Sequence, residues 1–175
     1  MEPTADFDFQ SEYFFDSSGF KIMSRGSGWR MFMLSSNAWR TLTNELYKRF
    51  SSGAEVIMFD MGVSYSSELV ALLASTARGA HPGDFKHLLM KNGWGKITVG
   101  GDLELGTHLA IVITDCVFCG EDGDIERNCP FMRGASLGVA SALFKSEYKV
   151  SSKCNRNKSE IHVCKFELTS NNLKF

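Results

Sequence analysis

The chain has 175 residues, of which 43% are hydrophobic, and its 19 basic and 20 acidic residues give a formal net charge of −1. A chain of this length can bury the core of one domain, but it is too short for a sensor domain and a separate output domain. No stretch of the sequence concentrates Lys or Arg, which argues against nucleic-acid binding.

The sequence also carries expectations about location and redox state. We find no apolar run of roughly 18 residues, and the acidic start MEPTADFDFQ lacks the basic and apolar regions of a secretion signal. We therefore expect a cytoplasmic protein without a membrane span. The odd number of cysteines, five, favours thiols used singly or as metal ligands over a disulfide framework.

The chain begins with an aromatic and acidic segment, and we interpret residues 1–28 as an arm that docks onto the core or onto a dimer partner. Residues 29–175 then form a single domain. Its first element is the short apolar run Trp29–Leu34, which indicates a strand. A helix follows, with Ser36 or Asn37 as its N-cap. Apolar residues recur in this helix at helical spacing, namely Trp39, Leu42, Leu46 and Phe50.

A longer helix is predicted over Ala54–Ala77, and Gly62 near its middle suggests a bend. Its apolar stripe, which is typical of a helix face that packs on a core, consists of Ile57, Met61, Tyr65, Leu69 and Leu72. The sequence HPG then breaks the pattern. After it, Asp84 can cap a short helix that carries Phe85 and Leu89.

The following segments have the patterns of strands and one further helix. GWGKITV and the β-branched run HLAIVITDCVF are separated by turn glycines, and Phe131–Phe144 is predicted to be helical. EYKVSSKC and EIHVCKFEL then form a terminal hairpin. Its alternation places His162, Cys164 and Phe166 on one face.

The five cysteines lie at or near the ends of these elements. Cys116 and Cys119 form a C-x-x-C sequence at the end of a strand, and Cys129 occupies the cap position of the helix that follows. At that position the helix dipole favours a thiolate. Antiparallel pairing of the hairpin brings Cys154 and Cys164 close together.

These thiols could serve as metal ligands. Zinc prefers four soft or borderline ligands in a tetrahedron, and five thiols together with His162 are enough to provide them. The spacing is not that of a zinc finger, and free cysteines are often small buried hydrophobic residues. The residues alone therefore leave both interpretations open.

Gly134 and Gly138 lie one turn apart on the same face of the predicted helix, which leaves that face almost without side chains. One interpretation is that a neighbouring helix or strand packs closely against it, because helical glycines cost stability that packing must offset. The other is that the space holds a bound apolar molecule.

The sequence contains none of the motifs GxGxxG, P-loop, HExxH and GxSxG, so we expect no enzyme. A thiolate nucleophile at Cys129 is the remaining catalytic interpretation. The base and the oxyanion donors that it would need are not identifiable in the sequence.

With these segments in place, the chain resembles the 4-vinyl-reductase domain family, a small-molecule-binding module related to the TRAPP trafficking subunits. The resemblance rests on the order of WRMFML, the long helix with its central glycine, GWGKITV, and CPFMRGASLG followed by KC and VCKF. These segments cover roughly Gly28 to Leu168. The resemblance implies an α+β, TRAPP-like fold, in which a twisted antiparallel sheet packs against several helices, and it implies homodimers.

The resemblance further implies a sensor domain that binds a hydrophobic or aromatic small molecule between sheet and helices and acts on a separate output protein. We expect the pocket to be lined by Phe85, Leu89, Trp94, Ile111, Ile113, Phe131, Gly134 and Gly138. The alternative is an assembly subunit of the same architecture, which binds other proteins through its surface.

A structural zinc ion is the cofactor that the resemblance implies. The sensor relatives hold zinc with a cysteine before the glycine helix, a glutamate and two later cysteines. Cys129, Cys154 and Cys164 match the three thiols, whereas Ser151 stands at the position of the glutamate. The candidates for the fourth ligand are Cys119 or Cys116, and after them His162 or Glu147.

Overall fold

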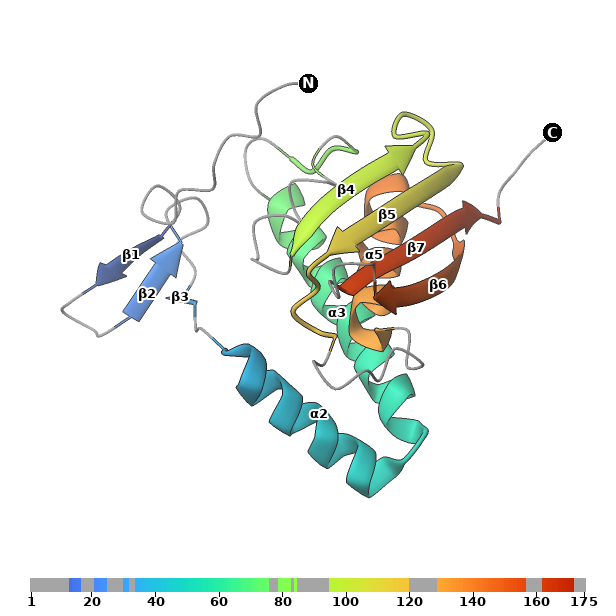
Figure 1. Ribbon diagram of the computed structural model, residues 1–175. Helices are drawn as coiled ribbons and strands as arrows, with labels where there is room; N and C mark the ends of the chain where they lie inside the picture. Colours follow the sequence, from blue (N-terminus) through green and yellow to red (C-terminus); the bar gives the residue numbers. More distant parts are fainter. Residues whose placement is uncertain are drawn as a thin grey trace. The chain divides into compact units, whose positions relative to one another are not determined.

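The computed structural model describes residues 13–16, 21–24, 30–31, 34–75, 79–82, 84, 95–119, 129–156 and 162–171. The chain forms two compact units, Met1–Ala38 and Trp39–Phe175. The described strands of the first unit are β1 (Tyr13–Asp16), β2 (Lys21–Ser24) and β3 (Arg30–Met31), which pair antiparallel in this order (Figure 1). The strand predicted at Trp29–Leu34 is present as β3, and Leu34 lies outside it. The division into an arm and one domain stays a prediction.

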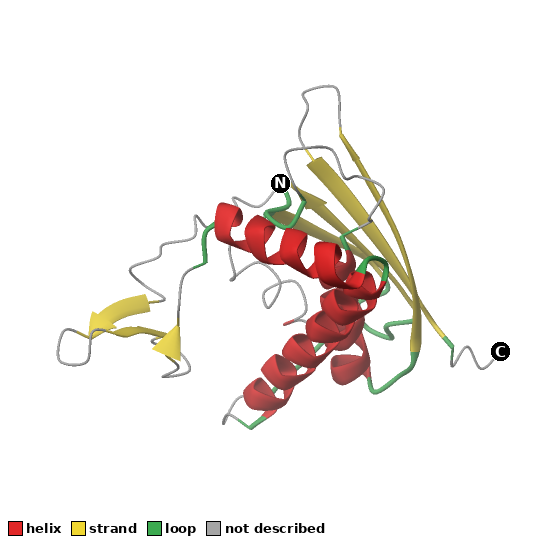
Figure 2. Cartoon of the chain, turned by 90° about the horizontal axis from the view of Figure 1, so that it is seen from below, coloured by secondary structure: helices red, strands yellow, loops and turns green. Residues whose placement is uncertain are grey.

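The second unit has the predicted α+β fold. Its helices are α2 (Ser36–Phe50, which begins in the last residues of the first unit), α3 (Gly53–Ala74) and α5 (Pro130–Phe144). Its strands β4 (Lys96–Gly101), β5 (His108–Thr114), β6 (Tyr148–Arg156) and β7 (His162–Ser170) form one antiparallel sheet in the order β4-β5-β7-β6. Helix α5 packs on one face of this sheet, and α3 packs on α5 (Figures 1 and 2).

Helix α2 has its N-cap one residue earlier than predicted. The Ser35 Oγ accepts a hydrogen bond from the Ala38 N–H at 3.1 Å, so Ser35 takes the capping role expected of Ser36 or Asn37. No residue of α2 is fully buried. It attaches to the second unit through three half-buried side chains, Trp39, Leu46 and Tyr47.

Helix α3 buries a different face from the one that its apolar stripe predicts. Met61, Tyr65 and Leu72 of that stripe are 45%, 39% and 42% exposed. The buried residues are Ala54, Met58, Gly62, Ser66 and Val70. The predicted face is wrong because α3 is apolar on most of its circumference, so that small side chains rather than hydrophobicity decide which side packs.

The small residues let the backbones of α3 and α5 approach each other closely. A Cβ atom at Gly134 of α5 would overlap with the carbonyl oxygen of Phe59 in α3, and one at Gly138 would meet the α3 backbone one turn later. Gly62 of α3 meets the carbonyl oxygen of Phe131 in the same way. Helix α3 continues without interruption through Gly62, so this glycine allows a close contact instead of ending a helical segment.

Strand β7 lies inside the sheet and carries much of the core. Its Cys164 and Phe166 are fully buried, whereas Lys165 between them is exposed, which confirms the predicted alternation. The register places Cys164 beside Ile113 of β5 on one side and Cys154 of β6 on the other. The sheet therefore brings two cysteines from separate strands next to each other.

Helix α3 is also long and apolar enough to cross a membrane by length and composition, alone among the helices of the described residues. This finding corrects the expectation that no segment of the chain reaches that length. A helix that packs one face inside an α+β domain passes the same test. The cytoplasmic location therefore stays a prediction.

The contact between α3 and α5 predicts the effect of a single methyl group. We expect Gly134→Ala to lower the free energy of unfolding by about 3 kcal/mol, because neither backbone can move away without disturbing the core. The control is Gly53→Ala at the start of α3, whose Cβ would lie 3.7 Å from Phe50, an ordinary contact. Urea unfolding followed by circular dichroism measures both, and equal stabilities would contradict the assigned role of Gly134.

Candidate metal centre

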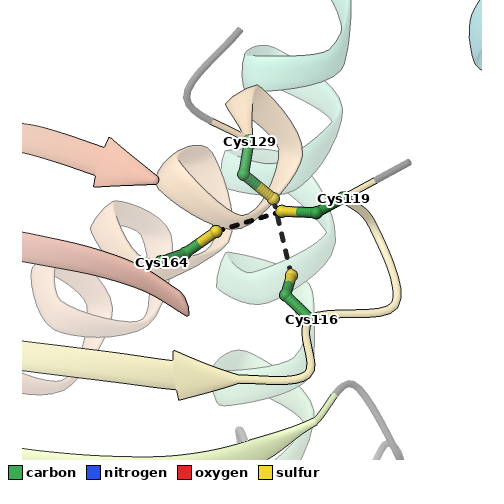
Figure 3. Close-up of side chains that lie close together, drawn as sticks. All are labelled: Cys116, Cys119, Cys129 and Cys164. Atoms are coloured by element: carbon green, nitrogen blue, oxygen red, sulfur yellow. Dashed lines mark hydrogen bonds between the residues drawn. The ribbon is translucent and has the colours of Figure 1, made fainter. Parts of the chain in front are cut away.

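Four cysteine side chains from distant parts of the sequence converge on one point. Cys116 and Cys119 follow β5, Cys129 precedes α5, and Cys164 lies in β7 (Figure 3). Their four Sγ atoms all lie within 4.8 Å of one another. The Cys116 and Cys129 sulfurs are 3.7 Å apart, and those of Cys119 and Cys164 are 3.0 Å apart. We call this set the four-thiol cluster.

Short local structures aim these thiols at one another. Strand β5 ends at Thr114, and Asp115 adopts a left-handed conformation with φ 59°, which turns the chain out of the sheet. The Cys119 N–H then donates to the Cys116 carbonyl at 3.1 Å, closing a tight turn that brings both thiols to the same side. Cys129 is the N-cap of α5 as predicted, with a left-handed φ of 48°.

The fifth cysteine, Cys154, lies directly beside the cluster. It is buried and pairs with Cys164 across β6 and β7, and its thiol interacts with those of Cys119 and Cys164. The four mutually close sulfurs do not include it. Of the predicted ligands, the structure thus gathers Cys116, Cys119, Cys129 and Cys164, and places Cys154 at their edge.

The donor set fits a tetrahedral metal ion. Zinc–sulfur bonds of about 2.3 Å in a tetrahedron separate neighbouring sulfurs by about 3.8 Å. The closest sulfur pairs, at 3.0 and 3.7 Å, lie near this edge length, and no pair exceeds 4.8 Å. His162 and Glu147, the other candidates for the fourth ligand, do not belong to the cluster. Small side-chain rotations would bring all four thiols to ligand distance.

Hydrogen bonds within the cluster separate the pKa values of its thiols. Bonds from Cys116 and then Cys129 lower the pKa of Cys119 to about 4, and bonds from Cys119 and Cys164 lower the pKa of Cys154 to about 5. The same network raises the pKa of Cys129 and of Cys164, with the bond to Cys116 as the largest cause in each. At Cys129 this shift has the opposite direction to the one that the helix dipole favours.

Aromatic rings surround the segments that carry the thiols. We call Trp39, Tyr65, Phe118 and Phe131 the aromatic cluster. The Trp39 ring centroid lies 5.0 Å from that of Phe118 and 5.1 Å from that of Phe131, and the two phenylalanine rings are 4.8 Å apart. Tyr65 contacts Phe131 at 6.3 Å. Phe118 lies between two of the cysteines and Phe131 follows the third. The rings that contact Trp39 of α2 are therefore carried by the same segments as the thiols.

The residues predicted to line one pocket lie in different environments in the structure. Ile111 and Ile113 are fully buried in β5, and the open face of Gly134 and Gly138 is occupied by α3. Phe131 belongs to the aromatic cluster. Phe85, Leu89 and Trp94 lie outside the described residues. The pocket between sheet and helices stays a prediction.

Sequence patterns did not reveal a hollow of about 330 Å³ between α2 and α3. Its lining consists of Trp39, Leu42, Thr43, Glu45, Leu46, Arg49, Met58 and Met61. The exposed stripe of α3 was a signal for it, because Met61 belongs to that stripe and was assigned to the core. An apolar stripe on a helix marks an interface of some kind, and burial within the same domain is only one of them.

Comparison with known proteins identifies the fold. No protein-family model matches the sequence, and no curated protein matches it either. The phenol-responsive sensory domain of the transcription activator PoxR, with phenol, is similar in structure at 19% identity and a TM-score of 0.68, over 91% of this chain and 86% of that one. A mutant of T. tengcongensis H-NOX has 12% identity and a TM-score of 0.54, over 85% and 80% of the two chains.

A trafficking protein particle complex subunit 3 from Naegleria fowleri, covalently bound to palmitic acid, has 12% identity and a TM-score of 0.49, over 77% of this chain and 92% of that one. At such identities, a structural likeness concerns the fold alone. The likeness to the PoxR sensory domain establishes that this chain has the α+β fold of that domain.

The aromatic cluster predicts a local effect on α2. We expect Phe118→Ala to increase amide hydrogen exchange in α2 by about tenfold or more, because the Trp39 ring loses one of its two ring contacts within the described residues. Exchange in α5 should change little. Phe50→Ala, which shortens an exposed phenylalanine of the same helix, serves as the control. Mass spectrometry of α2 and α5 peptides reads out both, and equal acceleration in the two helices would contradict a specific role in holding α2.

Proposed function

We propose that this chain is a non-catalytic domain that binds a hydrophobic or aromatic small molecule, holds a structural zinc ion and acts as a homodimer. One observation carries the proposal: a closed four-thiol cluster is built into a fold shared with a phenol-responsive sensory domain. The four-thiol cluster connects the sheet to α5 and lies next to the aromatic cluster. A metal ion bound there would therefore support the fold that a sensor role needs.

Four features support zinc as the metal. The donors are soft thiols, they are four in number, their spacing fits a tetrahedron, and three of them are buried. Full protein ligation leaves no open position, which is the property of a structural site. When bound, zinc would supply cross-links among the end of β5, the start of α5 and β7. Such links stabilise the folded state, since an unfolded chain offers no preformed site.

The local chemistry of Cys129 supports a binding role over catalysis. This cysteine was the candidate nucleophile, and it lies buried among other thiols, where the bond to Cys116 raises its pKa. A raised pKa leaves less of the reactive thiolate. We therefore propose that the thiols act as ligands and that the output passes to a separate partner in the cytoplasm.

The small-molecule proposal predicts stabilisation by neutral aromatic compounds. At a concentration 100-fold above the dissociation constant, a bound ligand such as phenol or toluene should raise the melting temperature by about 5 °C or more. Benzoate, which is similar in size but charged, serves as the control, because an apolar pocket penalises an unpaired charge. Thermal-shift measurements on the zinc-loaded chain test this. A screen without any stabilising neutral compound would refute the small-molecule proposal and leave the metal proposal standing.

Exposed apolar side chains on α2 and α3 support the homodimer. Leu42 and Met61 are 53% and 45% exposed beside the hollow, and Tyr65 and Leu72 continue the stripe along α3. Contiguous apolar surface of this kind is typical of a protein interface. The same surface favours the alternative function, an assembly subunit, in which a different protein covers it.

The dimer proposal predicts that a charge on the stripe separates the two copies. Met61→Glu and Leu72→Glu should each raise the dimer dissociation constant at least about tenfold, because a carboxylate would be buried at the interface. Leu105→Glu introduces the same charge at a highly exposed leucine outside the stripe. Light scattering coupled to size exclusion measures the mass, relative to 19.5 kDa for one copy. A wild-type chain that runs as a monomer refutes the homodimer and favours the assembly alternative.

A further inference from the structure

A fifth thiol lies beside the four-thiol cluster, one more than a tetrahedral ion can use. Five cysteines lie together, and zinc takes four ligands in a structural site. Cys154, the fifth, is not an unrelated core residue, because its thiol interacts with the thiols of Cys119 and Cys164. One thiol of the group must therefore remain unligated beside a bound metal ion.

The position of Cys154 is asymmetric with respect to the cluster. Cys154 pairs with Cys164 across β6 and β7, next to the Cys119–Cys164 edge, whereas the Cys116 and Cys129 sulfurs form the opposite edge of the tetrahedron at 3.7 Å. Cys154 can thus approach a bound metal ion from the side of Cys164. Sulfurs on that edge are already 3.0 Å apart, closer than the edge of a zinc tetrahedron.

The two thiols on the crowded edge differ in how firmly the fold holds them. Cys164 is fully buried in β7, between two paired strands. Cys119 is half-buried and lies outside the sheet, beyond the turn that follows β5. Cys154 is buried in β6, fixed by its pairing with β7. If one ligand leaves the metal, Cys119 is the ligand with the fewest other restraints.

We propose that Cys154 is an alternative zinc ligand that replaces Cys119, so that the metal centre has two ligand sets sharing Cys116, Cys129 and Cys164. The proposal rests on the proposed zinc site. In the exchange, the bond from zinc to the Cys119 sulfur breaks and a bond to the Cys154 sulfur forms. One thiolate ligand replaces another, so the charge of the ligand set is unchanged. No oxidant or further reactant is needed.

The exchange has a structural consequence at the aromatic cluster. While Cys119 is a ligand, the short segment from Cys116 to Cys119 is tied to the metal at both ends. When Cys154 takes its place, only Cys116 holds that segment. Phe118 lies within the segment and contacts Trp39, so the ligand set controls how firmly α2 is attached.

The zinc affinities of serine variants test the proposal, because two ligand sets predict that shared and alternative ligands contribute unequally to zinc binding. Losing a shared ligand should weaken zinc binding by about 100-fold, while losing either alternative ligand should weaken it by less than about tenfold. Zinc is measured by competition with a chromogenic chelator on the full chain under reducing conditions. The variants are Cys119→Ser, Cys154→Ser, the double variant of both, and Cys116→Ser and Cys129→Ser as controls.

The proposal requires that the double variant lose zinc as the controls do. It is overturned if Cys119→Ser alone is as weak as Cys116→Ser, or if adding Cys154→Ser to it has no further effect. A wild-type chain that binds no zinc overturns the zinc site itself, a distinct result. Circular dichroism of each variant shows whether it folds. Absorption of the cobalt-substituted protein adds a count of sulfur ligands, with four expected in both single variants and three in the double variant.

Alkylation of the zinc-loaded wild-type chain tests the proposal without substituting any ligand. We expect N-ethylmaleimide to label Cys119 while one zinc ion stays bound, as seen by native mass spectrometry and peptide mapping. In Cys154→Ser, labelling of Cys119 should release the zinc. Loss of zinc on labelling of the wild type would overturn the exchange.

Discussion

The close approach of α3 and α5 is the constraint on which the rest of the second unit depends. Gly62, Gly134 and Gly138 let the two backbones touch, and the contact continues along α5 from its first turn. Because α5 also packs on the sheet, the position of α3 fixes the depth at which α5 lies. Cys129 and Phe131 are at the start of α5, so this contact sets where one thiol of the four-thiol cluster and one ring of the aromatic cluster are held.

The metal centre shows how far local sequence rules can lead. Strand and helix patterns correctly placed Cys129 at a helix cap and Cys164 on the same face of β7 as Phe166, whereas the predicted strand run contained Cys116 and β5 already ends at Thr114. They could not decide which four of five thiols converge, because that depends on the left-handed turn at Asp115, where an aspartate gives only a weak signal. The family resemblance favoured Cys154 as a ligand. The tight turn instead brings both cysteines of the C-x-x-C sequence into the cluster.

Helix α3 shows where sequence patterns fail. Its extent was predicted to within a few residues, but its buried side was not, because hydrophobicity is spread around most of the helix. Backbone contact favours the face with Gly62 and Ser66, since large side chains would keep α5 away. The stripe with Met61 and Leu72 is consequently left for another surface. An apolar stripe indicates that a helix face packs against another surface. A face of small residues indicates that the backbone of its neighbour comes close.

The four-thiol cluster and the packing of α2 are connected through Phe118. Phe118 lies between two cysteines of the four-thiol cluster, and among the described residues its ring is one of two that contact Trp39, which also lines the hollow between α2 and α3. Under the proposed exchange, a molecule or a second copy that binds this region more tightly with one ligand set must, by linkage, shift the equilibrium between the two ligand sets by the same factor. The size of that factor depends on how much of the Trp39 contact the proposed release of Cys119 would remove. A fully ligated ion, which has no open position for chemistry, can in this way still take part in a response.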